Sequence, residues 1–200
     1  MNSPVAIRAL LKKLKSYSVH LVTMEATGKY HCRLHDMLHE AGIRVAVINP
    51  FRSRQFADSI GKLAKTDTID AETLALFGKM MDPTPVAPPA LETKKLHDLH
   101  TARRQVSDEV ADLKRQLQTT EHPLAKRQIG ARIKLGDKHR LAIEAEIFDL
   151  IASSPALKRR FDIITSIPGI GRITAAVMLA DLSELGSVNA KQIAVLAGVA

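Results

Sequence analysis

Cysteine and aromatic residues are scarce in this sequence. Its 200 residues contain one cysteine and no tryptophan, and aromatic residues make up only 4%. A single cysteine, Cys32, excludes an intramolecular disulfide and favours a reducing compartment, so we expect a cytoplasmic protein. The shortage of aromatic residues argues against a single-strand nucleic-acid binder, because such proteins stack bases on aromatic side chains.

Long apolar runs and secretion signals are also absent. No stretch approaches the roughly 18 apolar residues that a membrane-spanning helix needs, so we expect no contact with a membrane. The first 15 residues carry four basic side chains between short apolar steps, unlike a secretory signal. The hydrophobic fraction of 46%, with 25% charged residues, excludes a wholly disordered chain.

Acidic residues are outnumbered by basic ones, 21 against 29, which gives a formal charge of +8 and a pI near 9.7. This surplus favours a polyanionic partner, most simply nucleic acid. The first twenty residues hold four strong bases and no acid, and residues 158–160 form a second basic run.

The first eighty residues predict alternating helices and strands. Helical spacing of apolar residues alternates with short β-branched runs, and Ser3 followed by Pro4 is typical of a helix start. Short connections between such elements are typical of parallel strands covered by helices, so we expect an α/β domain over residues 1–81. The predicted elements are helices over 4–14 and 29–41, strands over 20–24 and 44–49, and a helix after Asp67.

The remainder is predicted to be helical. Four prolines within residues 82–90 indicate a linker. Residues 91–152 predict two long amphipathic helices, joined near Pro123 as a coiled-coil hairpin with solvated, mixed charges. Residues 153–200 predict the start of a further helical domain, with a helix over 174–182. The predicted fold class is therefore α/β plus α.

Three carboxylates are candidate metal ligands. Glu25 directly follows a predicted buried strand, where open α/β sheets usually hold ligands. Asp67 and Asp70 are three residues apart and would share one side of a first helical turn. Such hard oxygen ligands suit Mg²⁺. Two alternatives remain open: Asp67 caps the helix, and Glu25 simply faces water.

A glycine-rich turn is a candidate phosphate-binding element. Gly169 and Gly171 allow backbone amides to approach a phosphate, and the following helix N-terminus adds positive potential. Arg172 and Arg160 are basic residues near this turn. Lys65 instead lies close in sequence to Asp67 and Asp70, where it either helps to neutralise phosphate charge or is simply solvated. The pattern is typical of helix-hairpin-helix modules, which hold DNA backbones without reading sequence. The alternative is an ordinary turn between two helices.

Histidine and serine patterns are weaker. His31, His35 and His39 have the i, i+4 spacing of metal ligands, but no cysteine or carboxylate converges with them, so we expect solvated side chains. Ser53 and Ser59 lack the histidine and aspartate partners of a catalytic nucleophile.

Four motifs together resemble the DEDD-type insertion-sequence transposases. This family includes the Piv-type pilin-inversion DNA invertases and the bridge-RNA-guided recombinases. The motifs occur in the same order and extend over nearly the whole chain. They are residues 24–31 (MEATGKYH), 47–50 (VINP), 65–71 (KTDTIDA) and 166–171 (SIPGIG).

The resemblance implies a RuvC-like, ribonuclease-H-type first domain, a coiled-coil insertion and a C-terminal transposase domain. It implies a Mg²⁺-binding acidic tetrad, of which Glu25, Asp67 and Asp70 match the second, third and fourth members. It also implies that the protein cleaves and exchanges DNA strands, pairs with further copies through the helical hairpin and, in some members, uses a guide RNA.

Two elements of the family have no counterpart in this sequence. The family's first acidic residue and the serine nucleophile of its RNA-guided members are expected outside this chain, before its start and after Gly198. We therefore expect a partial protein that does not recombine DNA by itself. The alternatives are a RuvC-like junction endonuclease and a non-enzymatic DNA- or RNA-binding adaptor.

Overall fold

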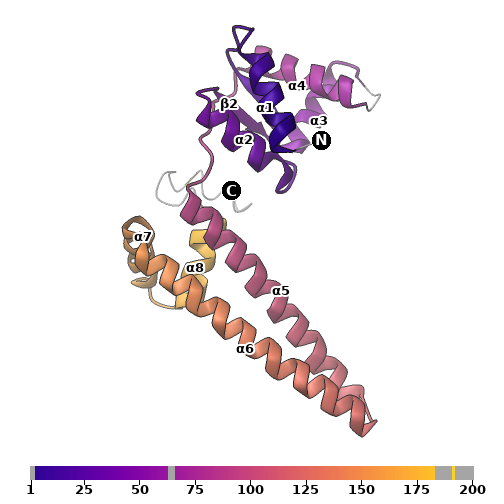
Figure 1. Ribbon diagram of the computed structural model, residues 1–200, viewed down its shortest axis with the longest axis vertical. Helices are drawn as coiled ribbons and strands as arrows, with labels where there is room; N and C mark the ends of the chain where they lie inside the picture. Colours follow the sequence, from indigo (N-terminus) through magenta and orange to yellow (C-terminus); the bar gives the residue numbers. More distant parts are fainter. Residues whose placement is uncertain (1–2, 63–65, 183–190, 192–200) are drawn as a thin grey trace. The chain divides into compact units, whose positions relative to one another are not determined.

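The structure, a computed structural model, describes residues 3–62, 66–182 and 191 (Figure 1). The chain divides into two compact units, residues 1–88 and 89–200. None of the helices in the described ranges is long and apolar enough to cross a membrane.

The first unit alternates helices and strands. Strands β1 and β2 are parallel, with Val22 opposite Val45 and Glu25 opposite Ile48, so both strands end at the same edge of the sheet. This confirms the predicted parallel pairing. The elements are α1 (Pro4–Leu14), β1 (Val22–Glu25), α2 (Tyr30–Glu40), β2 (Val45–Ile48), α3 (Pro50–Ser59) and α4 (Asp67–Met81).

Helices cover both faces of this small sheet. On one face Met24 and Val45 pack with Leu38 of α2 and with apolar residues of α1. On the other face Ala46 and Ile48 pack against α3 and α4, whose Phe56 and Phe77 rings meet edge to face at 5.2 Å. The alternation of side chains along each strand therefore produces a helix–sheet–helix sandwich.

Most predicted element bounds hold, with two corrections. The first helix spans residues 4–14 as predicted, and Ser3 caps it by accepting a hydrogen bond from the Ala6 amide at 3.2 Å. Strand β1 is shifted toward its C-terminus and includes Glu25 as its last residue. Helix α3 was not predicted, because Pro50 marks the end of a strand as well as the first position of a helix.

The proline-rich segment 82–90 is irregular, and it is bound to the first unit rather than free. The Val86 amide donates to the Val45 carbonyl at 2.8 Å, and the Val86 carbonyl accepts a hydrogen bond from His35 Nε2 at 2.7 Å. His35 is buried, so the expectation of a solvated side chain is wrong at this position. The carbonyl satisfies the ring nitrogen, which makes burial possible.

The second unit is helical, and its helices are α5 (Leu91–Thr119), α6 (Pro123–Ser153), α7 (Pro155–Thr165) and α8 (Arg172–Asp181). Helices α5 and α6 lie side by side as an antiparallel hairpin, and Pro123 begins the second helix (Figure 1). Helices α7 and α8 pack against the end of the hairpin opposite its turn, around Leu96, Ile151 and Leu179. Helix α8 begins two residues before the predicted start.

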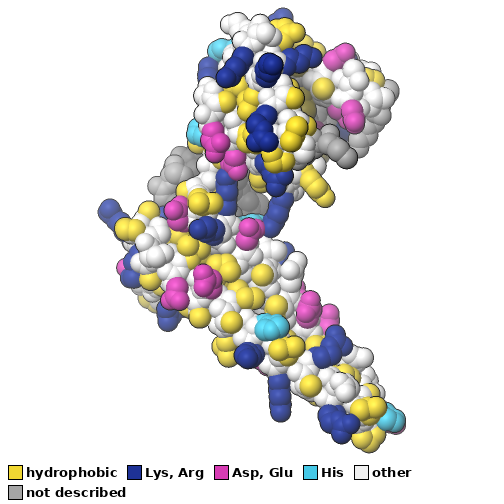
Figure 2. All heavy atoms as spheres, viewed as in Figure 1, with side chains coloured by type: hydrophobic (Ala, Val, Ile, Leu, Met, Phe, Trp, Pro, Cys, Tyr) yellow, Lys and Arg dark blue, Asp and Glu magenta, His cyan; other side chains and the backbone are white. Residues whose placement is uncertain are grey.

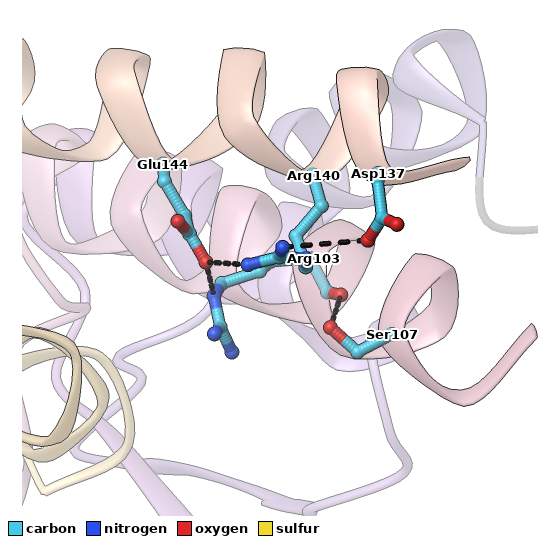
Figure 3. Close-up of polar contacts among 5 residues, drawn as sticks. All are labelled: Arg103, Ser107, Asp137, Arg140 and Glu144. Carbon is cyan, nitrogen blue, oxygen red and sulfur yellow. Dashed lines mark hydrogen bonds and ion pairs between the residues drawn. The ribbon is translucent and has the colours of Figure 1, made fainter. Parts of the chain in front are cut away.

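A polar cluster sets the register of the hairpin (Figure 3). Arg103 of α5 donates from Nε to Glu144 Oε1 of α6 at 2.7 Å, and Arg140 Nη1 lies 3.2 Å from the same oxygen. Arg140 also pairs with Asp137 at 3.4 Å, and Ser107 donates to the Arg103 carbonyl at 2.9 Å. Of these contacts, the Arg103–Glu144 pair joins α5 to α6, and Arg140 holds the half-buried Glu144 carboxylate from within α6. The pair between the helices resists sliding of α5 along α6.

A close helix–helix contact lies near this cluster. At Gly136 of α6, a Cβ atom would overlap the Cγ2 methyl of Val110 on α5. At Gly130 on the same helix, a Cβ would meet nothing within 4 Å. Glycine is therefore required for packing at position 136 but not at position 130.

Candidate functional site

Glu25 lies at the carboxyl end of the sheet and is held by a serine. It is the half-buried last residue of β1, and its Oε1 accepts a hydrogen bond from the Ser53 hydroxyl of α3. Ser53 is itself buried. Sequence reasoning missed this partner because α3 was not predicted and the two residues are 28 positions apart.

Asp67 and Asp70 lie in the first turn of α4, as predicted. The cap of this helix is Thr66, whose Oγ1 accepts a hydrogen bond from the Ile69 amide at 3.3 Å. The alternative that Asp67 caps the helix is therefore wrong. Both carboxylates remain exposed at the positive end of the helix dipole, where negative charge is stabilised.

Helix α4 packs unusually closely on β1. The Thr23 hydroxyl donates to the Leu74 carbonyl at 2.7 Å. At Gly78, a Cβ atom would lie only 2.8 Å from the Cγ2 methyl of Thr23. Because Thr23 is two residues before Glu25, and Leu74 follows Asp70 by about one helical turn, this contact fixes the two carboxylates relative to each other.

Glu25 and Asp70 line the same open cavity, of about 1070 Å³, between β1 and α4. Asp67 is not among the residues that line it. Within the described ranges, no three His, Cys, Asp or Glu side chains are gathered closely enough to hold a metal ion. Two of the three predicted carboxylates therefore line one cavity, and Lys65 lies outside the described residues.

His31 lines this cavity as well. Burial lowers the pKa of His31 below its ordinary value of 6.5, and the neighbouring His35 lowers it further, although a hydrogen bond to the Gly28 backbone acts in the opposite direction. Folding therefore shifts His31 toward its neutral form.

The glycine-rich turn between α7 and α8 is a type II turn over residues 167–170. Pro168 occupies its second position, Gly169 its third with φ +89°, and the Ile170 amide donates to the Ile167 carbonyl at 3.1 Å. The left-handed φ explains why glycine is needed at position 169. Gly171 has an ordinary φ of −76° and precedes the first helical residue of α8.

The N-terminus of α8 has no side-chain cap and has free space around it. No side chain caps it, and a Cβ on Gly171 would meet nothing within 4 Å. The guanidinium of Arg172 lies 4.1 Å from the centre of the Phe148 ring of α6, a cation–π contact that holds it beside the helix start. Unpaired amides and a fixed positive charge make this end of α8 suitable for a phosphate group.

Arg160 is less available than the sequence predicts. Its Nη2 lies 3.5 Å from the Leu182 carbonyl, so it joins α7 to the end of α8. Its neighbour Lys158 pairs with Asp162 one turn further along α7. Two of the three bases in this run therefore have partners within the unit.

Comparison with known proteins identifies the family. The profile of the DEDD transposase family of IS110 matches residues 1–120, and that of the IS116/IS110/IS902 transposase family matches residues 161–200. The chain belongs to the IS110 family of DEDD transposases. This IS110-family chain is 28% identical, over 184 residues, to the pilin gene-inverting proteins of Moraxella bovis and Moraxella lacunata. The match covers 92% of the chain but only 56% of each relative.

The IS110-family chain also carries an exposed basic stripe on α1. Arg8 and Lys12 of α1 and Lys15, its C-cap, are spaced by four and three residues, so they share one side of the helix, and all three are exposed. Lys13 points away from this stripe, and Ile7 is buried. On the face in Figure 2, basic side chains occur over both units, so the positive charge is not confined to a single patch.

Proposed function

We propose that this chain carries the metal-binding and DNA-binding parts of a cytoplasmic transposase or site-specific recombinase of a mobile insertion sequence. The observation that supports this most is the shared cavity of Glu25 and Asp70, at the carboxyl end of parallel strands, in a chain of the IS110 DEDD family. In this proposal the first unit is RuvC-like, and its acidic residues act on a DNA phosphate.

The donor atoms in the cavity fit a Mg²⁺ ion. Mg²⁺ is usually bound by one or two carboxylates, with water and substrate phosphate oxygens completing its shell. Glu25 and Asp70 supply two carboxylates on one cavity, and Asp67 is a third from the same helical turn as Asp70. When bound, the ion would neutralise charge on a DNA phosphate. The carboxylates would hold it, and the Thr23–Gly78 contact would keep their separation constant.

DNA binding is proposed for the second unit through its glycine turn. The open amides at the start of α8 and the guanidinium of Arg172 would contact a backbone phosphate, as in a helix-hairpin-helix module. Gly169 shapes this turn, and the basic stripe on α1 would contact further phosphates. Lys65 and Arg160 remain proposed contributors to the positive potential.

The helical hairpin is the proposed contact between copies. Helix α6 exposes Leu124 and Leu135, with exposed fractions of 49% and 53%, and their spacing of eleven residues places them on one side of the helix. Exposed leucines that share one side of a helix are typical of a coiled-coil partner surface. A guide RNA is a further proposed partner, on the resemblance to the bridge-RNA-guided members.

The experiment is a measurement of DNA affinity with and without Mg²⁺. Fluorescence anisotropy of a labelled duplex would compare the unmodified chain with Asp70→Asn and with Glu72→Gln. Glu72 is a matched control because it lies on the same helix but pairs with Lys62 and does not line the cavity. We expect Mg²⁺ to strengthen binding by the unmodified chain and by Glu72→Gln, but not by Asp70→Asn.

A Mg²⁺ effect that is equal in all three proteins, or absent from all three, would contradict the metal part of the proposal. Equal, metal-independent affinity for duplex DNA would support the adaptor alternative. A parallel titration with RNA of the same length separates a DNA-binding from an RNA-binding protein.

A further inference from the structure

We propose that Ser53 is a positioning residue for Glu25: its hydroxyl orients the carboxylate so that the other carboxylate oxygen is free to bind a divalent cation. This inference rests on the proposed metal site. It adds a residue that lies outside all four sequence motifs and that comes from helix α3, an element with no predicted function.

The Ser53 hydroxyl that contacts Glu25 is buried. Ser53 is only 6% exposed, and its hydroxyl donates to Glu25 Oε1. The Pro50 carbonyl is a second possible acceptor, at 3.0 Å. A serine hydroxyl has one proton, and an ionised carboxylate is a stronger acceptor than a carbonyl, so the proton goes to Glu25.

Helix α3 holds Ser53 firmly. The helix begins at Pro50, and Asn49 caps it by accepting a hydrogen bond from the Phe51 amide at 2.8 Å. Phe56, less than one turn beyond Ser53, is buried against Phe77 of α4. Ser53 therefore acts from a rigid element, as effective support for a metal ligand requires.

The hydrogen bond leaves one carboxylate oxygen for a cation. Oε1 of Glu25 accepts the hydrogen bond from the Ser53 hydroxyl, and Glu25 lines the cavity shared with Asp70, so the proposal assigns Oε2 to the cation. Without the hydroxyl, the glutamate side chain regains rotamer freedom that must be lost again when the cation binds. Residues that orient metal ligands in this way typically contribute 10- to 100-fold in metal affinity, which sets the expected effect at about tenfold or more.

The test is an isothermal titration of the full 200-residue chain with Mn²⁺, which prefers the same oxygen ligands as Mg²⁺. We expect Ser53→Ala to weaken Mn²⁺ affinity by about tenfold or more. Ser59→Ala is the matched control, because Ser59 lies on the same helix and donates to the Phe56 carbonyl at 2.7 Å instead of to a carboxylate. It should leave the affinity unchanged.

A double-mutant cycle separates positioning from a general effect on folding. In a Glu25→Gln background, Ser53→Ala should have no further effect on Mn²⁺ affinity, because there is no carboxylate left to orient. Unfolding followed by circular dichroism reports whether each variant folds. If Ser53→Ala does not fold, Ser53→Cys replaces it, since a thiol is similar in size but a weak donor, and the same loss is expected.

The outcomes distinguish the two proposals. If Glu25→Gln and Asp70→Asn weaken Mn²⁺ binding but Ser53→Ala does not, the positioning role is wrong and the metal site stands. If Ser53→Ala weakens binding equally with and without Glu25, the serine acts on the fold and the positioning role is again wrong. If neither carboxylate variant changes Mn²⁺ binding, the proposed function itself fails.

Discussion

Replacing Gly78 by alanine should force helix α4 away from strand β1. The added Cβ would lie 2.8 Å from the Cγ2 methyl of Thr23, a side chain that cannot swing aside because its hydroxyl is bonded to the Leu74 carbonyl. Overpacking of this kind costs about 1–3 kcal/mol. Alanine recovers about 0.5–1 kcal/mol relative to glycine in a helix. We therefore expect Gly78→Ala to lower the free energy of unfolding of the first unit by about 1 kcal/mol.

Combining Gly78→Ala with Thr23→Ser tests whether the methyl of Thr23 causes the loss of stability. Thr23→Ser removes the offending methyl and keeps the hydroxyl that donates to Leu74. In the Thr23→Ser background the alanine Cβ no longer overlaps a methyl group, so only the higher helix propensity of alanine acts. Gly78→Ala should then raise the free energy of unfolding by about 0.5–1 kcal/mol. The coupling energy between the two positions is then about 2 kcal/mol.

The assay is urea unfolding followed by tyrosine fluorescence. The chain has two tyrosines and no tryptophan, and both tyrosines, Tyr17 and Tyr30, lie in the first unit. The signal therefore reports this unit and not the helical hairpin. If Gly78→Ala changes stability equally with threonine and with serine at position 23, the close contact between α4 and β1 does not exist.

Three further predictions concern other parts of the molecule. Because folding lowers the pKa of His31, the neutral ring contributes fully to folding stability above its ordinary pKa of 6.5, and this contribution declines as the pH falls below that value. The loss of thermal stability between about pH 7 and 5 should therefore be smaller in His31→Gln than in the unmodified chain. Gly130→Ala should raise the stability of the hairpin by about 1 kcal/mol, whereas Gly136→Ala should lower it, as measured by thermal unfolding; equal shifts would contradict the packing. Lys12→Gln should lower the slope of log DNA affinity against log salt concentration by the amount expected for about one phosphate contact, and Lys13→Gln should leave this slope unchanged.

Local features of the fold could be predicted from the sequence because they depend on neighbouring residues. The start of α1 follows from a capping serine before a proline, and the parallel pairing of β1 and β2 follows from two short apolar runs around a helical segment. The type II turn at residues 167–170 follows from adjacent proline and glycine. Each of these signals lies within a few residues of the structure that it specifies.

Features that depend on distant residues could not be predicted. The burial of His35 requires the Val86 carbonyl, 51 positions away, and the orientation of Glu25 requires Ser53 on a helix whose first proline also fits the end of a strand. The contact of Arg160 with the Leu182 carbonyl, 22 positions away, could not be predicted either, and its role toward nucleic acid stays a prediction. The resemblance to the DEDD family predicts the carboxylates, but it does not indicate which side chains hold them in place.

A Mn²⁺ titration of Asp70→Asn against Glu72→Gln decides whether Glu25 and Asp70 belong to a divalent-cation site of this IS110-family chain. Both substitutions remove one negative charge from the same helix, but only Asp70 lines the cavity. We expect Asp70→Asn to weaken Mn²⁺ affinity by about tenfold or more and Glu72→Gln to leave the affinity unchanged. Equal affinity in both variants, or no binding by the unmodified chain, would contradict the divalent-cation site.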